Sequence, residues 1–397
     1  DVIVFNTCCI RKAAENKILA NIGYVKNIKA KNPNLIVAVC GCMSQQEEKA
    51  KYIYKTFPFV NIIFGTHNIS SFGEYLDEYA RTQKRIFSLK DSTEVLNEDV
   101  PMFRTSGYNA WVNIMYGCNN FCSYCIVPYV RGRERSRRSE DIIDECKTLV
   151  ASGVKEITLL GQNVNSYKAD ITFPMLLGRI AEINGDFIIR FMTSHPKDTS
   201  DELISVMKRY TPKIAPFFHL PLQSGSNRIL KEMNRTYSRE KYLEIADKLK
   251  SSIPGIALST DIIIGFPTET EEDFADTMDI IRSVEFDNVY AFLYSPREGT
   301  KAAKMEGTVD REIKDSRMAE LLKLQDKLSL DRNLPYENTT QRVLVDSFEY
   351  RNGERICCGR TLTNKLVYFP SDVDVGKFTE VKIIKACPYH LLGKAER

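Results

Sequence analysis

The chain has 397 residues, of which 43% are hydrophobic and 27% are charged, and its formal net charge is +3. This length exceeds that of most single domains, so we expect two or three domains with real cores. The nearly balanced charge gives no argument for nucleic-acid binding, which has to come from local basic patches. No apolar run reaches the length of a membrane span and no secretion signal is visible, so we expect a cytoplasmic protein.

Residues 1–84 alternate between short apolar runs and helical periodicity. Strands are predicted at residues 2–5, 35–39 and 60–64, and a helix at residues 13–31. This alternation predicts an open α/β domain with a parallel sheet, of the Rossmann or flavodoxin-like type. Residues 85–108 have weaker periodicity and contain Pro101, so they are interpreted as a linker.

A strand–helix unit then repeats six times over residues 109–334. The predicted strands are residues 110–115, 156–160, 187–193, 217–222, 258–264 and 289–294, with Ser139 as the N-cap of the first helix and a last helix at 313–330. Six such units predict a partial (βα)6 parallel barrel. In such barrels the chemistry gathers at the carboxyl ends of the strands.

Residues 335–397 differ in composition from the rest of the chain. Short β runs are predicted at residues 342–345, 366–369 and 379–384, separated by turn residues. We interpret this part as a small antiparallel β-barrel domain.

The strongest chemical signal is a C-x3-C-x2-C loop formed by Cys118, Cys122 and Cys125, directly after a predicted strand. Eleven cysteines in a long chain without a secretion signal indicate metal binding where they cluster. Three thiolates can bind three irons of a four-iron cubane and leave the fourth iron open. The alternatives are a zinc site completed by a remote ligand, or buried structural thiols.

The spacing of this loop resembles the pattern of the radical-SAM superfamily. The resemblance implies that the open iron chelates S-adenosylmethionine and that one electron cleaves it to methionine and a 5′-deoxyadenosyl radical. It also implies that Tyr124, just before the last cysteine of the loop, lies near the adenine of this cofactor.

A second set of cysteines follows the first two predicted strands. Cys8 comes after Asn6-Thr7, and Cys42 comes after Gly41. The carboxyl ends of parallel strands converge, so these two thiols can share one metal centre. Taken alone, they would rather be interpreted as buried apolar thiols.

With both cysteine sets, the chain resembles the radical-SAM methylthiotransferases over essentially its whole length. These enzymes have an N-terminal cluster-binding domain, a radical-SAM barrel and a C-terminal TRAM domain. The resemblance implies that Cys8 and Cys42 hold an auxiliary [4Fe-4S] cluster with a third cysteine. Because the chain opens within a strand, we expect that third ligand upstream of Asp1; Cys9 or Cys40 is the alternative.

The stretches 6–11, 127–132 and 160–167 resemble the enzymes that act on dimethylallyladenosine in tRNA. The implied reaction replaces the C2 hydrogen of the adenine at position 37 with a methylthio group. It uses two molecules of S-adenosylmethionine, one as methyl donor and one as radical source. Threonylcarbamoyladenosine in tRNA and a ribosomal-protein aspartate are the alternative substrates, and an iron–sulfur RNA-binding protein without cofactor cleavage is the rival class.

The candidates for binding S-adenosylmethionine are polar residues at successive strand ends, Gln162, Asn163, Ser194 and Gln223, together with Asp261, an acid within an apolar run. The alternative for the first four is hydrogen bonding at strand ends and helix caps. For Asp261 the alternative is a buried salt bridge to Arg190 or Arg235. His195 and His219 are more readily interpreted as core histidines than as catalytic ones.

A basic run follows the cysteine loop, and other basic residues lie in the β domain. Phosphate contact is the functional interpretation, and a solvated surface the alternative. The candidates are Arg131, Arg133, Arg135, Arg137 and Arg138, then Arg360, Lys365, Lys377 and Lys382, with Tyr368 or Phe369 as a stacking residue. The expected partners are the tRNA anticodon stem-loop and an electron donor such as flavodoxin or ferredoxin, and the protein is expected to be a monomer. The remaining cysteines, Cys146, Cys357, Cys358 and Cys387, are expected to pack in helices and strands.

Overall fold

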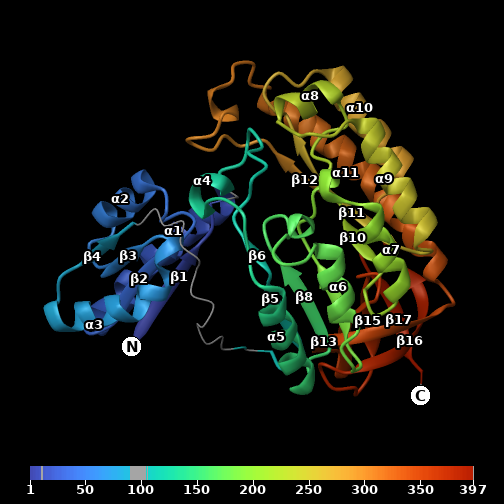
Figure 1. Cartoon of the computed structure of the whole chain (residues 1–397), viewed down its shortest axis with the longest axis horizontal. Helices are drawn as coiled ribbons and strands as arrows, with labels where there is room; N and C mark the ends of the chain where they lie inside the picture. The colour runs from blue at the N-terminus through green and yellow to red at the C-terminus, as the bar shows by residue number, and fades with distance from the viewer. Residues whose placement is uncertain (10–11, 90–103, 105, 397) are drawn as a thin grey trace. The chain divides into compact units, whose positions relative to one another are not determined.

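The computed structural model describes residues 1–9, 12–89, 104 and 106–396. The chain forms two compact units, each built from separate stretches of sequence (Figure 1). Unit 1 comprises Asp1–Phe103, Tyr116–Arg135 and Ser295–Ala303, and unit 2 comprises Arg104–Met115, Ser136–Tyr294 and Lys304–Arg397. Most of the predicted linker, residues 90–103 and 105, lies outside the described residues.

Unit 1 contains the predicted open α/β sheet. Its strands pair in the order β1-β2-β3-β4, and every pairing is parallel. Its elements are β1 (Val2–Thr7), α1 (Lys12–Lys31), β2 (Ile36–Gly41), α2 (Glu47–Thr56), β3 (Ile62–Phe64), η1 (Thr66–Ser71), α3 (Phe72–Thr82), β4 (Ile86–Ser88) and α4 (Val127–Arg131). The three strands and the helix predicted for this part of the chain are confirmed. β4 lies within the residues predicted as a linker, because three residues are too few to show a period.

The sheet of unit 1 is buried on both faces. All residues of β2 after its first are buried, which is typical of an internal parallel strand. Val37 and Val39 belong to one hydrophobic cluster, and Ala38 and Cys40 belong to another. Because successive side chains of a strand point to opposite faces, the two clusters lie on the two sides of the sheet.

Unit 2 contains six parallel strands that form two three-stranded sheets, β5-β8-β9 and β10-β11-β12. An isolated parallel bridge between Ile189 and Ile214 continues the first sheet toward the second. The strands are β5 (Asn109–Asn113), β8 (Glu156–Leu160), β9 (Ile188–Phe191), β10 (Phe217–His219), β11 (Ala257–Ile264) and β12 (Asn288–Leu293). The predicted partial (βα)6 barrel is therefore confirmed.

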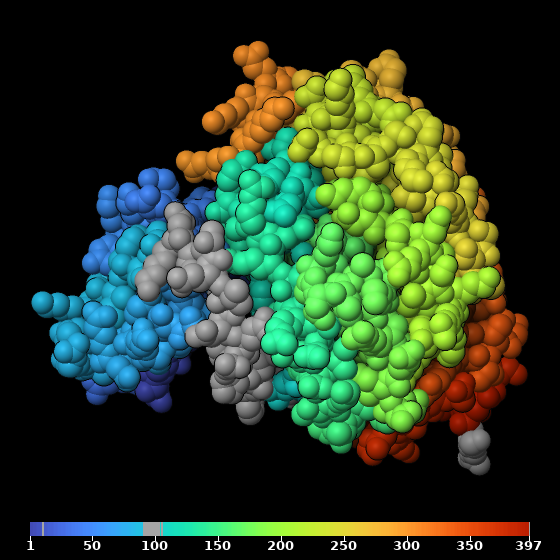
Figure 2. Space-filling model, viewed as in Figure 1, coloured from blue at the N-terminus to red at the C-terminus, as the bar shows by residue number. Residues whose placement is uncertain are grey.

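Helices alternate with these strands, and on the face shown in Figure 2 their green to yellow residues make up much of the surface of unit 2. They are α5 (Ser139–Ala151), α6 (Phe173–Ala181), α7 (Asp201–Tyr210), α8 (Asn227–Glu232), α9 (Arg239–Ser252), α10 (Glu271–Val284) and α11 (Arg311–Asn333), with the short turns η2 (Val164–Ser166), η3 (Pro196–Asp198), η4 (Ala302–Lys304) and η5 (Leu334–Tyr336). The prediction of Ser139 as an N-cap is wrong. Arg138 takes that position, and the Ser139 hydroxyl donates instead to Asp170.

The C-terminal strands form a closed β-barrel, drawn in orange and red in Figure 1, in the order β13-β14-β15-β17-β16. They are β13 (Thr340–Arg351), β14 (Glu354–Thr361), β15 (Leu366–Pro370), β16 (Phe378–Ala386) and β17 (Leu391–Ala395). The predicted β-barrel is confirmed, with one difference: β15 and β17 pair in parallel. Two of the five strands, β14 and β17, were not predicted.

Two short strands, β6 (Met115–Tyr116) and β7 (Arg135–Ser136), pair with each other and enclose the cysteine loop. Across the described residues, no helix combines the length and the apolar character that a membrane span requires.

Candidate functional site: two cysteine sets and a row of polar strand ends

The loop that carries Cys118, Cys122 and Cys125 is held at its base by backbone contacts. The Cys118 amide donates to the Gly132 carbonyl at 3.2 Å, and the Cys125 amide donates to the Cys122 carbonyl at 2.9 Å. Gly117 has φ +76°, and a Cβ there would lie 2.0 Å from the Arg133 carbonyl oxygen. Only glycine therefore allows the two ends of the loop to approach this closely.

The three thiols of the loop differ in exposure. Cys118 and Cys122 are buried, and Cys125 is half-buried. Burial raises the pKa of the Cys118 thiol, and a metal cation bound to its sulfur would favour the thiolate form. Tyr124 is half-buried in the same loop.

The second cysteine set lies at the carboxyl ends of β1 and β2. Cys42 is buried, its amide donates to the Thr7 carbonyl at 3.0 Å, and Cys8 is exposed. Cys9, which is fully buried, shares a thiol hydrogen bond with Cys42. Cys40 is buried in the cluster on the other side of the sheet. Cys42 as a cluster ligand stays a prediction, and its hydrogen bond with Cys9 was not predicted from the sequence.

Two groups favour the thiolate form of Cys42. The Cys9 thiol donates a hydrogen bond to it, and the Arg131 guanidinium lies beside it with Nε 3.1 Å from the sulfur. Together they lower the pKa of Cys42 to about 6, although burial acts in the opposite direction. The same hydrogen bond and burial raise the pKa of Cys9, which keeps that thiol protonated.

In unit 2, the predicted polar residues follow the carboxyl ends of the strands. Gln162 and Asn163 follow β8, Ser194 follows β9, and Gln223 follows β10. Three side-chain oxygens there are buried and have no hydrogen-bond partner among the residues that the structure describes: Gln162 Oε1, Asn163 Oδ1 and Ser194 Oγ. Buried polar atoms are rarely left in this state, so the three are candidates for contacts to a ligand.

Gln223 has a strained backbone in addition to its place at a strand end. Its φ is +73°, which is uncommon for a residue with a side chain, and the residue is buried. Its amide donates to the Asp261 carbonyl at 2.8 Å, and its own carbonyl accepts from the Ile263 amide at 2.9 Å. These contacts fix the Gln223 backbone beside β11.

Asp261 has a different partner from either of the predicted arginines. Its carboxylate lies 3.5 Å from Nε2 of His219, whose Nδ1 contacts the Ser259 hydroxyl at 2.9 Å. Arg190 and Arg235 are engaged elsewhere, with Glu156 and with the Pro221 carbonyl. The salt-bridge alternative for Asp261 is therefore wrong.

His195 is a satisfied core histidine, as expected. It is 4% exposed, and its Nδ1 accepts from the Lys197 amide at 3.2 Å. Burial and the positive charges of Arg235 and Lys197 lower its pKa to about 2, so it stays neutral at physiological pH.

The arginine run after the cysteine loop divides into different roles. Arg137 is buried, bridges Glu145 and the Asn113 carbonyl, and is structural. Arg133 is exposed and lies over the Phe121 ring at 4.3 Å. Arg138 is exposed and paired with Glu140, and the Arg135 guanidinium donates to the Arg131 carbonyl. Of this run, Arg133 and Arg138 present the most accessible charge.

In the β-barrel, the predicted RNA residues also divide. The Lys365 ammonium is buried and lies 2.6 Å from the Asp287 carboxylate, so the prediction that it grips a phosphate is corrected to a structural role. Phe369 is fully buried in the barrel core and cannot stack on a base. Arg360 is partly exposed, Lys377 and Lys382 are exposed, and Tyr368 is half-buried.

Two exposed aromatic residues on β13 were not among the RNA contacts predicted from the sequence. Phe348 and Tyr350 are 47% and 69% exposed and lie edge to face at 6.0 Å. Their spacing of two residues places them on one face of the strand, which was the signal that could have identified them. Of the other cysteines, Cys146 and Cys357 are fully buried in cores, as expected, whereas Cys358 in β14 and Cys387, just after β16, are half-buried.

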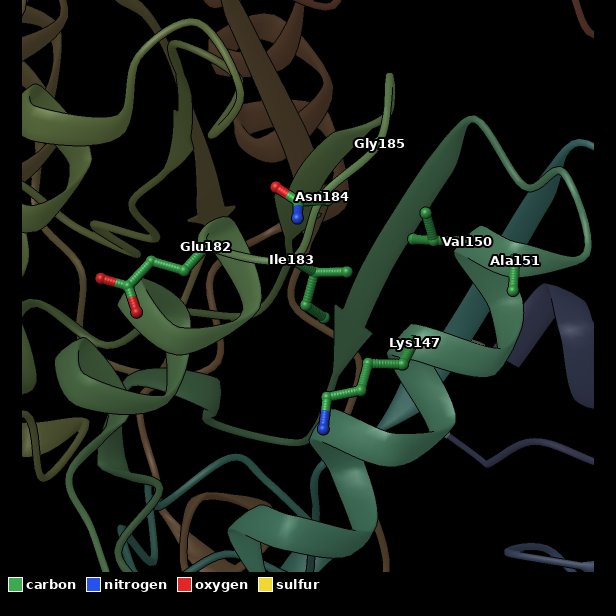
Figure 3. Close-up of a pocket in the computed structure, with 7 residues that line it drawn as sticks. All are labelled: Lys147, Val150, Ala151, Glu182, Ile183, Asn184 and Gly185. Carbon is green, nitrogen blue, oxygen red and sulfur yellow. The ribbon is translucent and has the colours of Figure 1, made fainter.

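A surface hollow of about 570 Å³ lies elsewhere in unit 2 (Figure 3). Lys147, Val150 and Ala151 at the end of α5 line it, together with residues 182–185 between α6 and β9. Both segments lead into the amino ends of their following strands. The hollow is therefore at the opposite edge of the sheet from the polar strand ends.

Models of three families match the chain. The Radical SAM superfamily matches residues 112–281, the uncharacterized protein family UPF0004 matches residues 1–65, and the TRAM domain matches residues 335–395.

Curated relatives match nearly the whole chain. A tRNA-2-methylthio-N(6)-dimethylallyladenosine synthase of Clostridium botulinum (strain Okra / Type B1) is 50% identical over 399 residues, covering 99% of this chain and 88% of the relative. The synthase of the same name from Caldicellulosiruptor saccharolyticus is 51% identical over 399 residues, covering 99% of this chain and 84% of the relative. The chain belongs to the tRNA-2-methylthio-N(6)-dimethylallyladenosine synthase family. The predicted family is thereby confirmed.

Solved structures support the fold of this chain. The cobalamin-dependent S-adenosylmethionine radical enzyme OxsB has a TM-score of 0.54 at 14% identity, covering 81% of this chain and 47% of that chain. The radical S-adenosylmethionine methyltransferase TsrM from Kitasatospora setae has a TM-score of 0.55 at 12% identity, covering 71% of this chain and 60% of that chain.

The residues present fit the cofactors expected of a synthase of this family. Within the described ranges, no three His, Cys, Asp or Glu side chains approach closely enough to hold a single metal ion. The thiolates around a four-iron cluster bind different irons, so they need not approach as closely as the ligands of one ion. The donor chemistry fits, since Cys118, Cys122 and Cys125 lie on one loop. For S-adenosylmethionine, the three unpartnered oxygens in unit 2 can accept from its ammonium and hydroxyl groups.

Proposed function

We propose that this chain adds a methylthio group to C2 of N6-dimethylallyladenosine at position 37 of tRNA. The observation that carries the proposal is the loop of Cys118, Cys122 and Cys125 in a chain that is 50% identical to such synthases over nearly its whole length. Two [4Fe-4S] clusters and two molecules of S-adenosylmethionine would supply the electron, the radical, the sulfur and the methyl group that the reaction requires. The C2–H bond is too weakly acidic for a side-chain base, which is why radical chemistry is needed.

The protein's own residues would bind and orient these groups. Cys118, Cys122 and Cys125 would hold the radical-SAM cluster through three of its irons. Their partly buried loop limits the access of water to that cluster. Cys8 and Cys42 would hold the auxiliary cluster, and Cys9 is a candidate ligand in place of Cys8 because it contacts Cys42 directly.

The polar strand ends of unit 2 would bind S-adenosylmethionine. Gln162, Asn163 and Ser194 offer the three unpartnered oxygens described above. Gln223 follows β10, and Asp261 lies within β11. Tyr124 would lie at the adenine.

The tRNA would be contacted through exposed cations. Arg133 in unit 1 and Arg360 in the β-barrel remain the candidates. We further propose that the chain acts as a monomer in the cytoplasm and receives electrons from a flavodoxin or a ferredoxin.

The test is anaerobic reconstitution of the protein, followed by measurement of 5′-deoxyadenosine and of modified nucleosides by mass spectrometry. Cys122→Ala should abolish 5′-deoxyadenosine formation and leave tRNA binding largely intact, whereas Cys146→Ala, at a core cysteine, should keep the activity. Unchanged 5′-deoxyadenosine output from Cys122→Ala would refute the assignment. If only threonylcarbamoyladenosine is methylthiolated, that nucleoside is the substrate in place of dimethylallyladenosine.

A second variant separates the two cysteine sets. Cys42→Ala should still cleave S-adenosylmethionine but form no methylthio product. The iron contents of Cys8→Ala and Cys9→Ala should then show which of these neighbouring thiols is a ligand. Normal methylthio product from Cys42→Ala contradicts an auxiliary cluster at this place.

A further inference from the structure

Arg131 is the last residue of α4, the short helix that follows the cysteine loop. Its Nε donates to the Cys42 sulfur at 3.1 Å, across 89 residues of sequence. Both residues belong to unit 1. An arginine from beside one cysteine set thus contacts a cysteine of the other set.

The position of α4 is fixed from several directions. Ile126 and Val130 are buried in the hydrophobic cluster that also contains Cys9 and Cys42. The Thr66 hydroxyl donates to the Val130 carbonyl at 2.6 Å. Directly after Arg131, the Gly132 carbonyl accepts from the Cys118 amide at 3.2 Å. The Arg131 backbone is therefore held between the cysteine loop and the core of the sheet.

The chemistry of this contact follows from its partners. A guanidinium stays protonated at all physiological pH values, so Arg131 is always a charged donor. A hydrogen bond to a cluster sulfur stabilises the more negative, reduced state of the cluster and raises its reduction potential. Such a donor beside the ligand also holds the thiolate in its binding orientation.

We propose that Arg131 is a positioning residue for the auxiliary cluster, which orients the Cys42 thiolate and raises the reduction potential of the cluster bound there. This inference rests on the proposed function, because it requires a cluster at Cys42. It also changes the role of Arg131. The guanidinium that was predicted to contact a tRNA phosphate is directed at a cysteine.

The experiment uses the full chain with Cys118, Cys122 and Cys125 replaced by alanine, so that only the auxiliary cluster gives a signal. Into this background we place Arg131→Met, which removes the donor, and Arg131→Lys, which keeps the charge. Arg133→Met is the matched control, because Arg133 is exposed on the Phe121 ring. Iron and sulfide content, an EPR-monitored redox titration and tRNA affinity are measured for each variant.

We expect Arg131→Met to shift the ratio of reduced to oxidised cluster about tenfold toward the oxidised form, or about 59 mV for one electron. Arg131→Lys should give a smaller shift, and Arg133→Met none. Loss of iron in Arg131→Met with retention in Arg131→Lys also supports the positioning role. If Arg131→Met does not fold, the change in the reduction potential of Arg131→Lys tests the inference in its place.

Two results would overturn the inference, and a third would overturn its basis. An unchanged potential in both Arg131 variants at full iron content rules out the proposed role. A weakened tRNA affinity with an unchanged potential assigns Arg131 to phosphate contact instead. If the background chain with intact Arg131 binds no iron, the auxiliary cluster of the proposed function fails, and the role of Arg131 fails with it.

Discussion

Burial decides the role of several charged residues in this chain. Lys365 and Asp287 are 9% and 8% exposed and form an ion pair at 2.6 Å, whereas Arg360 on the neighbouring strand is 43% exposed. A buried ammonium cannot reach a phosphate without leaving its carboxylate uncompensated. Sequence patterns identify such cations, but they do not show which of them remain accessible.

Lys365→Met should therefore destabilise the fold rather than weaken RNA binding. Removing one partner of a buried pair costs about 3–5 kcal/mol, and denaturant unfolding should show a loss of this size. Arg360→Met should cost less than about 1 kcal/mol and should reduce both the affinity for tRNA and its salt dependence. If Lys365→Met instead folds with normal stability and its tRNA affinity depends less on salt, Lys365 contacts a phosphate as the sequence predicted.

The carboxyl of Asp346 in β13 should make the stability of the fold depend on pH. Burial raises its pKa from 3.8 to about 6, although Arg360 acts in the opposite direction. A folded-state pKa above the unfolded one means that the folded state binds more protons between these values, so its stability falls as the pH rises from about 4 to about 6.

Asp346→Asn removes this titration. We expect its unfolding midpoint to rise by about 1–3 °C at pH 7.5 and to change little at pH 4.5, where the folded carboxyl is already protonated. Asp372→Asn, at an exposed carboxylate of the same barrel, is the control. Equal gains at both pH values would show that the charge of Asp346 is not the cause.

At the scale of single elements, the sequence predicts best where a segment carries its own pattern. β8 was predicted at the bounds that the structure shows, since it is a short, mostly apolar run that ends just before Gly161. β10 ends at His219, three residues earlier than predicted, just before the Leu220-Pro221 step where the ladder cannot continue. β14 was missed although it forms a hairpin with β13 around Asn352-Gly353, which is a local turn signal. β17 was missed because part of its pairing is with β15, which local alternation does not report.

The helix α4 also could not be predicted from its local sequence, because five residues are too few to form a stable helix alone. Its stability must come from Ile126 and Val130 in the core of unit 1. We expect Ile126→Ala to cost about 2–5 kcal/mol and Ile126→Val about 0.5–1.5 kcal/mol. Tyr129→Ala, at a residue that is 57% exposed, should change the stability by less than about 0.5 kcal/mol.

Hydrogen exchange of the β2 amides measures this loss directly within unit 1. If α4 supports the site as inferred, Ile126→Ala should also lower the iron retained at the auxiliary cluster. Equal exchange rates in Ile126→Ala and Tyr129→Ala would mean that α4 does not stabilise the sheet.

At the scale of the whole molecule, the sequence predicted candidate residues but not all of the contacts between them. It singled out both cysteine sets from their spacing and from the strand ends they follow, and their roles as cluster ligands stay predictions. It did not predict that Arg131 contacts Cys42 or that Cys9 faces it, because these contacts join residues that are far apart in sequence or differ by one position in a turn. Which of these residues come into contact depends on how the core packs, and a local sequence pattern does not report that packing.

Within unit 2, Arg190 joins the six-strand body to the β-barrel. It is 6% exposed on β9, its Nε contacts Glu156 at 2.7 Å, and its other nitrogens donate to the Thr361 and Leu362 carbonyls at 2.9 and 3.0 Å. Arg342 also joins the barrel to this body, through Asp186, but that ion pair is exposed. The two arginines therefore offer a matched comparison of a buried and an exposed connection.

Arg190→Met would leave Glu156 without its charged partner and two barrel carbonyls without donors, at a cost of about 3–5 kcal/mol. We expect the β-barrel to unfold or detach before the body, giving two calorimetric transitions and faster proteolysis between residues 334 and 340. Arg342→Met should cost less than about 1 kcal/mol and keep the wild-type profile. Since the proposed tRNA contact Arg360 lies in the barrel, Arg190→Met should also raise the KM for tRNA while S-adenosylmethionine cleavage without tRNA is unchanged. Equal effects of the two substitutions would show that the buried arginine is not what holds the barrel in place.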